Sequence, residues 1–215
     1  MNNLKLISIF IFMVLTACQT SQKKSLDTLS AEQLSNVPKY SWETKAQVRD
    51  LKKHKVNNLT IDFLAIKNYQ LRLEIQATLG IPVGTLGMNN EKFIAILYTQ
   101  KKVFQGRVNE KVLSKAFHLP IPPEALYSIA FDEPIIGQFW SCSKNKEQVV
   151  SNCENSKTSM RVLWLNRTKE GTKLVKIQGP TMEVDWFFKA PEELKPSAET
   201  FTINIPDGYK NINID

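Results

Sequence analysis

Alternation of hydrophobic and polar residues is the strongest pattern in the chain. Within residues 71–77, Leu71, Leu73, Ile75 and Ala77 share one face, and charged or amide side chains occupy the other. This period of two predicts a β-strand with one buried face. Similar stretches bounded by turn-forming residues predict further strands over residues 46–54, 58–67, 84–89, 92–99, 102–107, 136–142, 158–167, 172–178, 181–189 and 199–205.

Several of the predicted strands are apolar on both faces. In the 92–99 stretch both alternating sets are apolar, with Phe93, Ala95 and Leu97 on one side and Ile94, Ile96 and Tyr98 on the other. A sheet with one face in water would alternate more cleanly. We therefore expect a mainly β (α+β) domain built on a curved antiparallel sheet whose concave side is covered. The pattern leaves open whether this sheet encloses a packed core or an apolar cavity.

Two short helices interrupt the strands. Asn109 can cap the first, and Pro122 opens the second, because proline is tolerated in the first turn of a helix. Their apolar sides recur at helical spacing and contain Val112, Leu113, Ala116 and Phe117 in the first helix and Leu126, Ile129 and Ala130 in the second. We expect both helices to lie over the concave side of the sheet.

The chain begins with a short apolar run. Lys5 precedes Leu6–Leu15, which is apolar apart from Ser8. Its length of about 10 residues fits the apolar region of a signal peptide, since a membrane-spanning helix needs about 20. Leu15-Thr16-Ala17-Cys18 follows where the run ends and looks like a bacterial lipobox. An ordinary signal peptide with an incidental cysteine is the alternative.

The lipobox predicts the organisation and the address of the protein. Residues 1–17 form a lipoprotein signal peptide, Cys18 carries a covalent diacylglyceryl and N-acyl group, residues 18–37 form a flexible tether, and residues 38–215 form the domain. Residue 19, directly after the cysteine, is glutamine rather than aspartate, which favours lipid anchoring at the periplasmic face of the outer membrane. Leu26, Leu29 and Leu34 could add one short helix to the tether.

The net charge is positive, at +7 for the chain. An exported protein rarely meets nucleic acid, so anionic lipid headgroups or acidic protein partners are the expected targets of this charge. The densest basic run is residues 52–55, Lys-Lys-His-Lys, and a solvated strand end explains it without a dedicated patch.

The other two cysteines form a natural pair. Cys142 and Cys153 flank a polar, turn-like stretch and would meet in an oxidising compartment, so we expect a disulfide across a hairpin. Such a bond would stabilise the fold by about 2–3 kcal/mol. Metal binding by these cysteines is the competing interpretation, but no histidine lies nearby in the sequence.

Residues typical of catalysis are sparse. The chain contains two histidines, His54 in the lysine run and His118 at the end of the first helix, where it can cap the helix. We find no catalytic triad, carboxylate pair or metal-ligand spacing, and therefore expect a non-enzymatic protein without a metal or a dissociable cofactor. We also expect a monomer.

Two stretches together resemble the LolB family of outer-membrane lipoprotein receptors. Residues 71–80 and 84–86, LRLEIQATLG followed by GTL, look like the family's strand, Pro-Leu-Gly loop and second strand. Residues 119–134 are similar to its Pro-Ile-Pro-x-x-x-Leu helix, which ends at a proline. This sequence departs from the family where Thr78 replaces the loop proline, where Ile129 and Asp132 replace Trp and Gly, and in having the two-cysteine hairpin.

The resemblance implies a LolA/LolB-like fold, an incomplete β-barrel with lid helices over an apolar cavity. It implies a receptor that accepts lipoprotein acyl chains from a LolA-like periplasmic carrier and inserts lipoproteins into the outer membrane. Leu79 matches the family's membrane-inserting loop residue, with Ile81 beside it, although Leu79 could equally be tucked into the core. The candidate residues of the cavity and lid are Leu73, Ile75, Leu113, Phe117, Leu126 and Ile129.

The departures keep a second function open. A non-enzymatic envelope lipoprotein could use the same fold to bind another hydrophobic ligand or a protein partner. The Cys142–Cys153 hairpin motivates this alternative, because it lies outside the usual family pattern.

Overall fold

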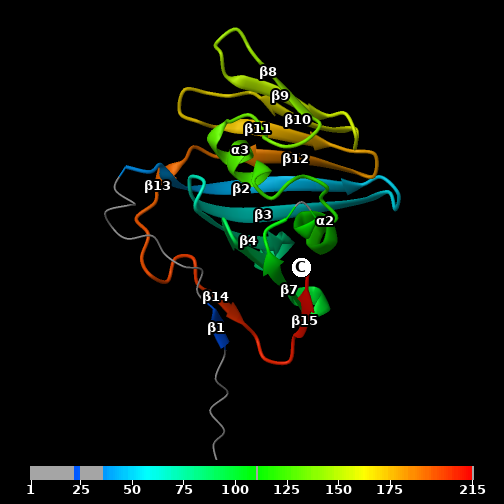
Figure 1. Ribbon diagram of the computed structural model, residues 1–215, viewed down its shortest axis with the longest axis vertical. Coiled ribbons are helices and arrows are strands. Elements are labelled where there is room, and N and C mark those ends of the chain that lie inside the picture. The colour runs from blue at the N-terminus through cyan, green and yellow to red at the C-terminus, as the bar shows by residue number, and fades with distance from the viewer. Residues whose placement is uncertain (1–21, 25–35, 110, 215) are drawn as a thin grey trace, which may run out of the picture.

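One large sheet forms the body of the protein (Figure 1). The computed structural model describes residues 22–24, 36–109 and 111–214. The strands of the sheet are β2 Lys39–Asp50, β3 Lys55–Ile66, β4 Gln70–Ala77, β5 Pro82–Asn89, β6 Lys92–Leu97, β7 Lys102–Arg107, β8 Trp140–Lys144, β9 Val150–Asn155, β10 Met160–Leu165, β11 Lys173–Gln178, β12 Met182–Phe188, β13 Glu192–Glu193 and β15 Lys210–Asn213. They pair in the order β15-β7-β6-β5-β4-β3-β2-β12-β11-β10-β9-β8, and β13 pairs with β2 beside this path.

The sheet is curved and open. All neighbouring strands are antiparallel except β15 and β7, which run parallel. β15 and β8 are the two ends of the order, and Figure 1 shows them far apart, so the barrel is incomplete. The predicted curved antiparallel sheet is therefore confirmed. Its curvature follows from strand twist, assisted by register shifts at Ile75/Gln76 and Ser143/Lys144.

Two short helices cover the concave face, as the sequence predicts. α2 spans Val112–Phe117 and α3 spans Ala125–Phe131. Their apolar side chains join the strands in one hydrophobic cluster, and both helices lie in front of the sheet in Figure 1. α2 ends at His118 and α3 at Asp132, each in the left-handed region with φ of 57°. No helix of the described residues is long and apolar enough to cross a membrane.

A small second core explains why β6 is apolar on both faces. Phe93, Ala95 and Leu97 belong to the main cluster, whereas Ile94 and Ile96 belong to another on the opposite face. The C-terminal segment covers that opposite face, and its strand β14, Ile203–Ile205, contributes both isoleucines and pairs with β1, Gln22–Lys24. Arg72 on β4 fastens this segment by donating hydrogen bonds to the carbonyl oxygens of Thr200 and Thr202, both at 3.0 Å.

Under α3 the concave face is tightly packed by aromatic rings. The ring of Trp42 lies 5.6 Å from that of Phe63 and 5.3 Å from that of Phe131, centroid to centroid, both edge to face. Trp186 and Phe188 continue the cluster with centroids 4.9 Å apart. The indole N–H of Trp186 donates to the Thr44 hydroxyl at 2.7 Å, which satisfies both buried polar groups.

A buried lysine fastens the end of α3 to the sheet. The side chain of Lys173 on β11 is 2% exposed, and its ammonium donates to the Ala130 carbonyl at 2.6 Å and to the Asp132 carboxylate at 2.9 Å. Burial lowers the pKa of Lys173, and the neighbouring carboxylate of Asp132 opposes that shift. The Arg167 guanidinium lies 3.3 Å from the same carboxylate. These contacts hold the last turn of the lid helix against the strands.

The two-cysteine hairpin has the predicted pairing and a different length. Cys142 on β8 and Cys153 on β9 are direct partners in the ladder and form a disulfide. The strand predicted over 136–142 instead spans Trp140–Lys144, and residues 150–155, expected partly as hairpin tip, form β9. The turn is residues 145–149, where the Asn145 side chain accepts the backbone N–H groups of Glu147 and Val149.

Other boundaries also differ from the predicted ones. β2 ends at Asp50, so most of the basic run forms a turn rather than a strand end. Only residues 203–205 of the predicted 199–205 strand form a strand. β13 and β15 were not predicted, because their residues do not alternate between apolar and polar. The signal peptide over residues 1–17, the lipidated Cys18 and the helix with Leu26, Leu29 and Leu34 lie outside the described residues.

We predict that Lys173→Met destabilises the fold by about 2 kcal/mol, because it leaves the buried Ala130 carbonyl without its donor and removes a cation from Asp132. Urea unfolding followed by tryptophan fluorescence would measure the change.

The matched control is Lys176→Met on the same strand. Lys176 points to the other face and lies 3.6 Å from Asp185 with a side chain 36% exposed, so its loss should cost less than about 0.5 kcal/mol. Equal or higher stability of Lys173→Met would show that burying the cation costs more than its contacts return.

Candidate ligand-binding site

An apolar pocket remains between the sheet and α2, where the helices do not fill the concave face. Its volume is about 740 Å³, within the range of pockets that hold small molecules. Strands β2 to β5, β11 and β12 form its floor, and the two helices with the segment after α2 form its roof. Its apolar lining consists of Ala46, Val48, Val56, Leu59, Ile61, Leu73, Ile75, Ala77, Val83, Leu86, Leu113, Phe117, Leu119, Leu126, Ile177, Met182, Val184 and Trp186.

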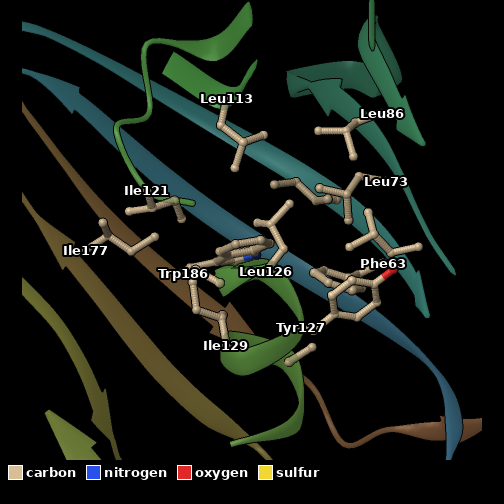
Figure 2. Close-up of a cluster of buried hydrophobic side chains, with 14 of the residues drawn as sticks. Phe63, Leu73, Leu86, Leu113, Ile121, Leu126, Tyr127, Ile129, Ile177 and Trp186 are labelled. Atoms are coloured by element: carbon tan, nitrogen blue, oxygen red, sulfur yellow. The ribbon is translucent and has the colours of Figure 1, made fainter. Parts of the chain in front are cut away.

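The pocket exists because strand alternation and helix spacing direct apolar side chains toward one space. Leu73 and Ile75 of β4 point to the concave side, and Leu86 joins them from β5. Figure 2 shows Leu113 and Leu126, from the two helices, facing Leu73 and Leu86 across this space. The side chains come from elements far apart in the sequence, so the pocket forms only when these strands and helices are folded together.

The remaining lining residues lie toward one end of the sheet and are polar. They are Lys55, Asn57, Asn58, Thr78, Thr99 and Gln100. These come from the start of β3 and from the two short 3₁₀ turns η1, Thr78–Gly80, and η2, Tyr98–Gln100. Lys55 is the single ionisable side chain in the lining, so the interior offers burial of apolar groups and no acid–base or nucleophilic pair.

An exposed leucine stands beside this polar rim. Thr78 lines the pocket, and the next residue, Leu79, is 93% exposed with φ of 65°. Ile81 follows at 56% exposure. A leucine in the left-handed region lowers the stability of the fold by roughly 1–2 kcal/mol. Because the Leu79 side chain is exposed, no burial of apolar surface offsets this cost. The loop therefore presents an apolar side chain outward at a cost in stability, and Leu79 is not tucked into the core.

The sequence candidates divide into three groups. Leu73, Ile75, Leu113, Phe117 and Leu126 all line the pocket. Ile129 lies on α3 but is fully buried in the packed part of the cluster, away from the lining.

The third group lies outside the pocket. Leu79 and Ile81 are exposed on the loop beside its rim, and Cys142 and Cys153 lie on β8 and β9 at the far end of the sheet order.

Several lining residues were not among the sequence candidates. Val48, Leu59, Val184 and Trp186 come from β2, β3 and β12. The alternation along these strands could have placed them on the concave face, but it could not say which part of that face the helices leave uncovered. That depends on where α2 and α3 sit along the strands.

A second depression lies on the outer face of the sheet near the same loop. Its volume is about 620 Å³, and it is lined mainly by polar strand residues together with Leu79, Leu174 and Phe187. It shares Ala46, Asn58, Leu59, Ala77 and Thr78 with the first pocket. Among the described residues, no three His, Cys, Asp or Glu side chains are grouped so as to hold a metal ion.

No protein-family model matches the sequence, and no curated protein matches it either. Among solved structures the chain is similar to an uncharacterized conserved protein from Thermus thermophilus, with 9% identity, a TM-score of 0.43 and coverage of 85% of this chain and 93% of that one. It is also similar to a LolA superfamily protein from Nitrosomonas europaea, with 7% identity, a TM-score of 0.44 and coverage of 82% and 99%.

We predict that Val48→Trp weakens binding of a fluorescent fatty acid about tenfold or more. Val48 is half-buried in the lining, and an indole there would displace at least two methylenes of a bound chain, each worth about 0.8 kcal/mol. Fluorescence titration would measure the dissociation constant.

Lys45→Trp on the same strand is the control, since Lys45 lines the outer depression. It should leave the affinity within about twofold. The opposite result, with Lys45→Trp blocking and Val48→Trp tolerated, would move the site to the outer face of the sheet.

We further predict that Leu79→Asn raises the free energy of unfolding by about 1 kcal/mol, because asparagine tolerates the left-handed region. Leu79→Ala keeps the Cβ and should change stability by less than about 0.5 kcal/mol. Urea denaturation of both variants measures the difference, and a less stable Leu79→Asn would mean that the leucine contributes packing after all.

Proposed function

We propose that this protein holds the acyl chains of lipids or lipoproteins in the pocket beneath α2 and passes them to a membrane. The observation that carries the proposal is the combination of an apolar pocket with an outward-pointing leucine at its rim. Neither feature alone calls for a membrane, but together they provide a binding site and a contact with the bilayer at the same end of the sheet.

The energetics suit a carrier. An acyl chain in water gains about 0.8 kcal/mol for each methylene that it buries, so an apolar pocket can extract a chain that is poorly soluble. The same gain is available in a bilayer, so release needs no chemical step. It needs a path that keeps the chain out of water, and the loop with Leu79 and Ile81 lies beside the pocket where that path would start.

The lipobox extends the proposal to location. With Cys18 acylated and residues 18–37 as a tether, the domain would work close to the periplasmic face of the outer membrane. Its cargo would then be lipoproteins, delivered by a LolA-like carrier and inserted into that membrane.

A scaffold that binds a protein partner remains the second candidate. The observation that favours it is the disulfide-closed β8–β9 hairpin, which ends the sheet at an edge strand. Lipid extraction from the purified protein separates the two functions, since a scaffold would yield no exchangeable acyl ligand.

We predict that Leu79→Glu slows transfer of a fluorescent diacylated lipopeptide from the protein to vesicles about tenfold or more, while affinity for the lipopeptide in solution changes little. Inserting a leucine into an apolar environment is worth roughly 2 kcal/mol, and a glutamate cannot supply it. Stopped-flow dequenching on mixing with vesicles measures the rate.

Ile136→Glu is the matched control, because Ile136 is 86% exposed and precedes β8 at the other end of the sheet order. It should transfer cargo at the original rate. Unchanged transfer by a folded Leu79→Glu variant would contradict the insertion role, and loss of solution binding would place Leu79 in the pocket itself.

A further inference from the structure

The tip of the β2–β3 hairpin, residues 51–56, is a compact basic projection (Figure 1). Lys52, Lys53, His54 and Lys55 are all exposed there, between the partly apolar ends Leu51 and Val56. Within the described part of the chain, none of the three lysine side chains makes an ion pair or a hydrogen bond.

The carboxylates at this end are already engaged. Asp50 accepts the backbone N–H groups of Lys52 at 3.0 Å and of Lys53 at 2.9 Å, and so holds the turn in shape. Glu183 and Asp185 both bind the Arg49 guanidinium, at 3.1 Å and 2.8 Å. Asp50 also attracts the ammonium groups of Lys53 and Lys52, which contributes to lowering its pKa, but three lysines against this one aspartate leave the exposed hairpin tip with a net positive charge.

The hairpin tip also belongs to the rim of the pocket. Lys55 and Val56 line the pocket, and Val56 is 52% exposed while Leu51 is 39% exposed. The η2 turn contributes to the same rim, and the exposed Lys101 directly follows it. Exposed lysines and exposed apolar side chains thus lie near the polar rim at the end of the sheet where Leu79 projects.

We propose that the hairpin tip binds the anionic headgroups of phospholipids and seats the rim of the pocket on a negatively charged membrane surface. This inference rests on the proposed function. It adds that the membrane receiving the acyl chains would carry anionic headgroups. Charge complementarity selects the occupant, because lysines flanked by short apolar side chains match an interface of phosphate groups above acyl chains. Leu79 would supply apolar insertion, and the hairpin tip would supply orientation.

The magnitude is measurable. A lysine near an anionic leaflet contributes roughly a fivefold increase in the binding constant. At about 0.1 M salt its attraction to the leaflet decays over a distance of about 10 Å. The paired substitution Lys52→Gln and Lys53→Gln should therefore weaken binding about 25-fold. Both residues lie outside the pocket lining, so affinity for a fatty acid in solution should stay the same.

The test uses the chain from residue 18 with Cys18→Ser, which keeps every described residue and carries no acyl anchor. Sedimentation compares vesicles of phosphatidylcholine alone with vesicles of equal parts phosphatidylcholine and phosphatidylglycerol. We expect the unaltered hairpin to bind the mixed vesicles at least tenfold more tightly, and the double variant to lose that preference.

Lys144→Gln with Lys146→Gln is the control, since these exposed lysines make the same charge change at the tip of the β8–β9 hairpin. It should retain the preference for anionic vesicles. A control that loses the preference as fully as the Lys52/Lys53 variant would reduce the effect to net charge and overturn the assignment.

Two further results would overturn the inference and leave the carrier function standing. One is equal binding to both kinds of vesicle, and the other is an unchanged anionic preference in the double variant, which would leave the hairpin tip for an acidic protein partner. Failure of the unaltered protein to bind a fatty acid in solution would instead remove the carrier function, whatever the vesicles show.

Discussion

The structure depends on one constraint, which is that a broad apolar concave face must be kept from water by two short helices. The face extends across most of a thirteen-stranded sheet, while α2 and α3 contain 6 and 7 residues. Leaving apolar area exposed to water costs about 25 cal/mol per Å², so packing the helices on the concave face stabilises the fold. α3 packs directly on the aromatic cluster around Trp42 and Phe63, and the space beside α2 is left as a pocket.

The antiparallel connections determine which turns lie together at one end of the sheet. The turns after β2, β4 and β6 lie at the same end of the sheet, because each follows a strand that runs in the same direction. That end carries the basic hairpin tip, the Leu79 loop and η2 around the pocket. The contacts that stabilise the fold lie elsewhere, in the packed half of the sheet where Lys173 binds Asp132. The strained, exposed leucine belongs to the end that we assign to membrane contact.

Much of this could be predicted from the pattern of residues. Strict alternation in 71–77 located β4, and helical spacing located α2 and α3 because apolar periodicity reflects burial directly. Cys142 and Cys153 were paired correctly because a hairpin brings them opposite each other. The resemblance also pointed to Leu79, whose exposure no periodicity argument could supply.

The remaining features depend on long-range packing. β15 adds to the sheet edge through backbone hydrogen bonds that need no apolar pattern, so Lys210–Asn213 gave no signal. Lys173 shares the inward face of β11 with Val175 and Ile177, and that alternation was the available clue to a buried lysine. Its partner is a helix end distant in the sequence. Ile129 and Leu126 have the same pattern on α3, and only the placement of the helix separates packed core from pocket lining.

The central claim is that the space beneath α2 holds an acyl chain. The most direct measurement is isotope-filtered nuclear Overhauser spectroscopy of the protein mixed with ¹³C-labelled palmitate. The account predicts contacts from the chain to the methyl groups of Leu73, Leu113 and Leu126, which face one another across the pocket. Contacts confined to Leu79, Leu174 and Phe187, which line the outer depression and not the pocket, or no contacts at all, would contradict it.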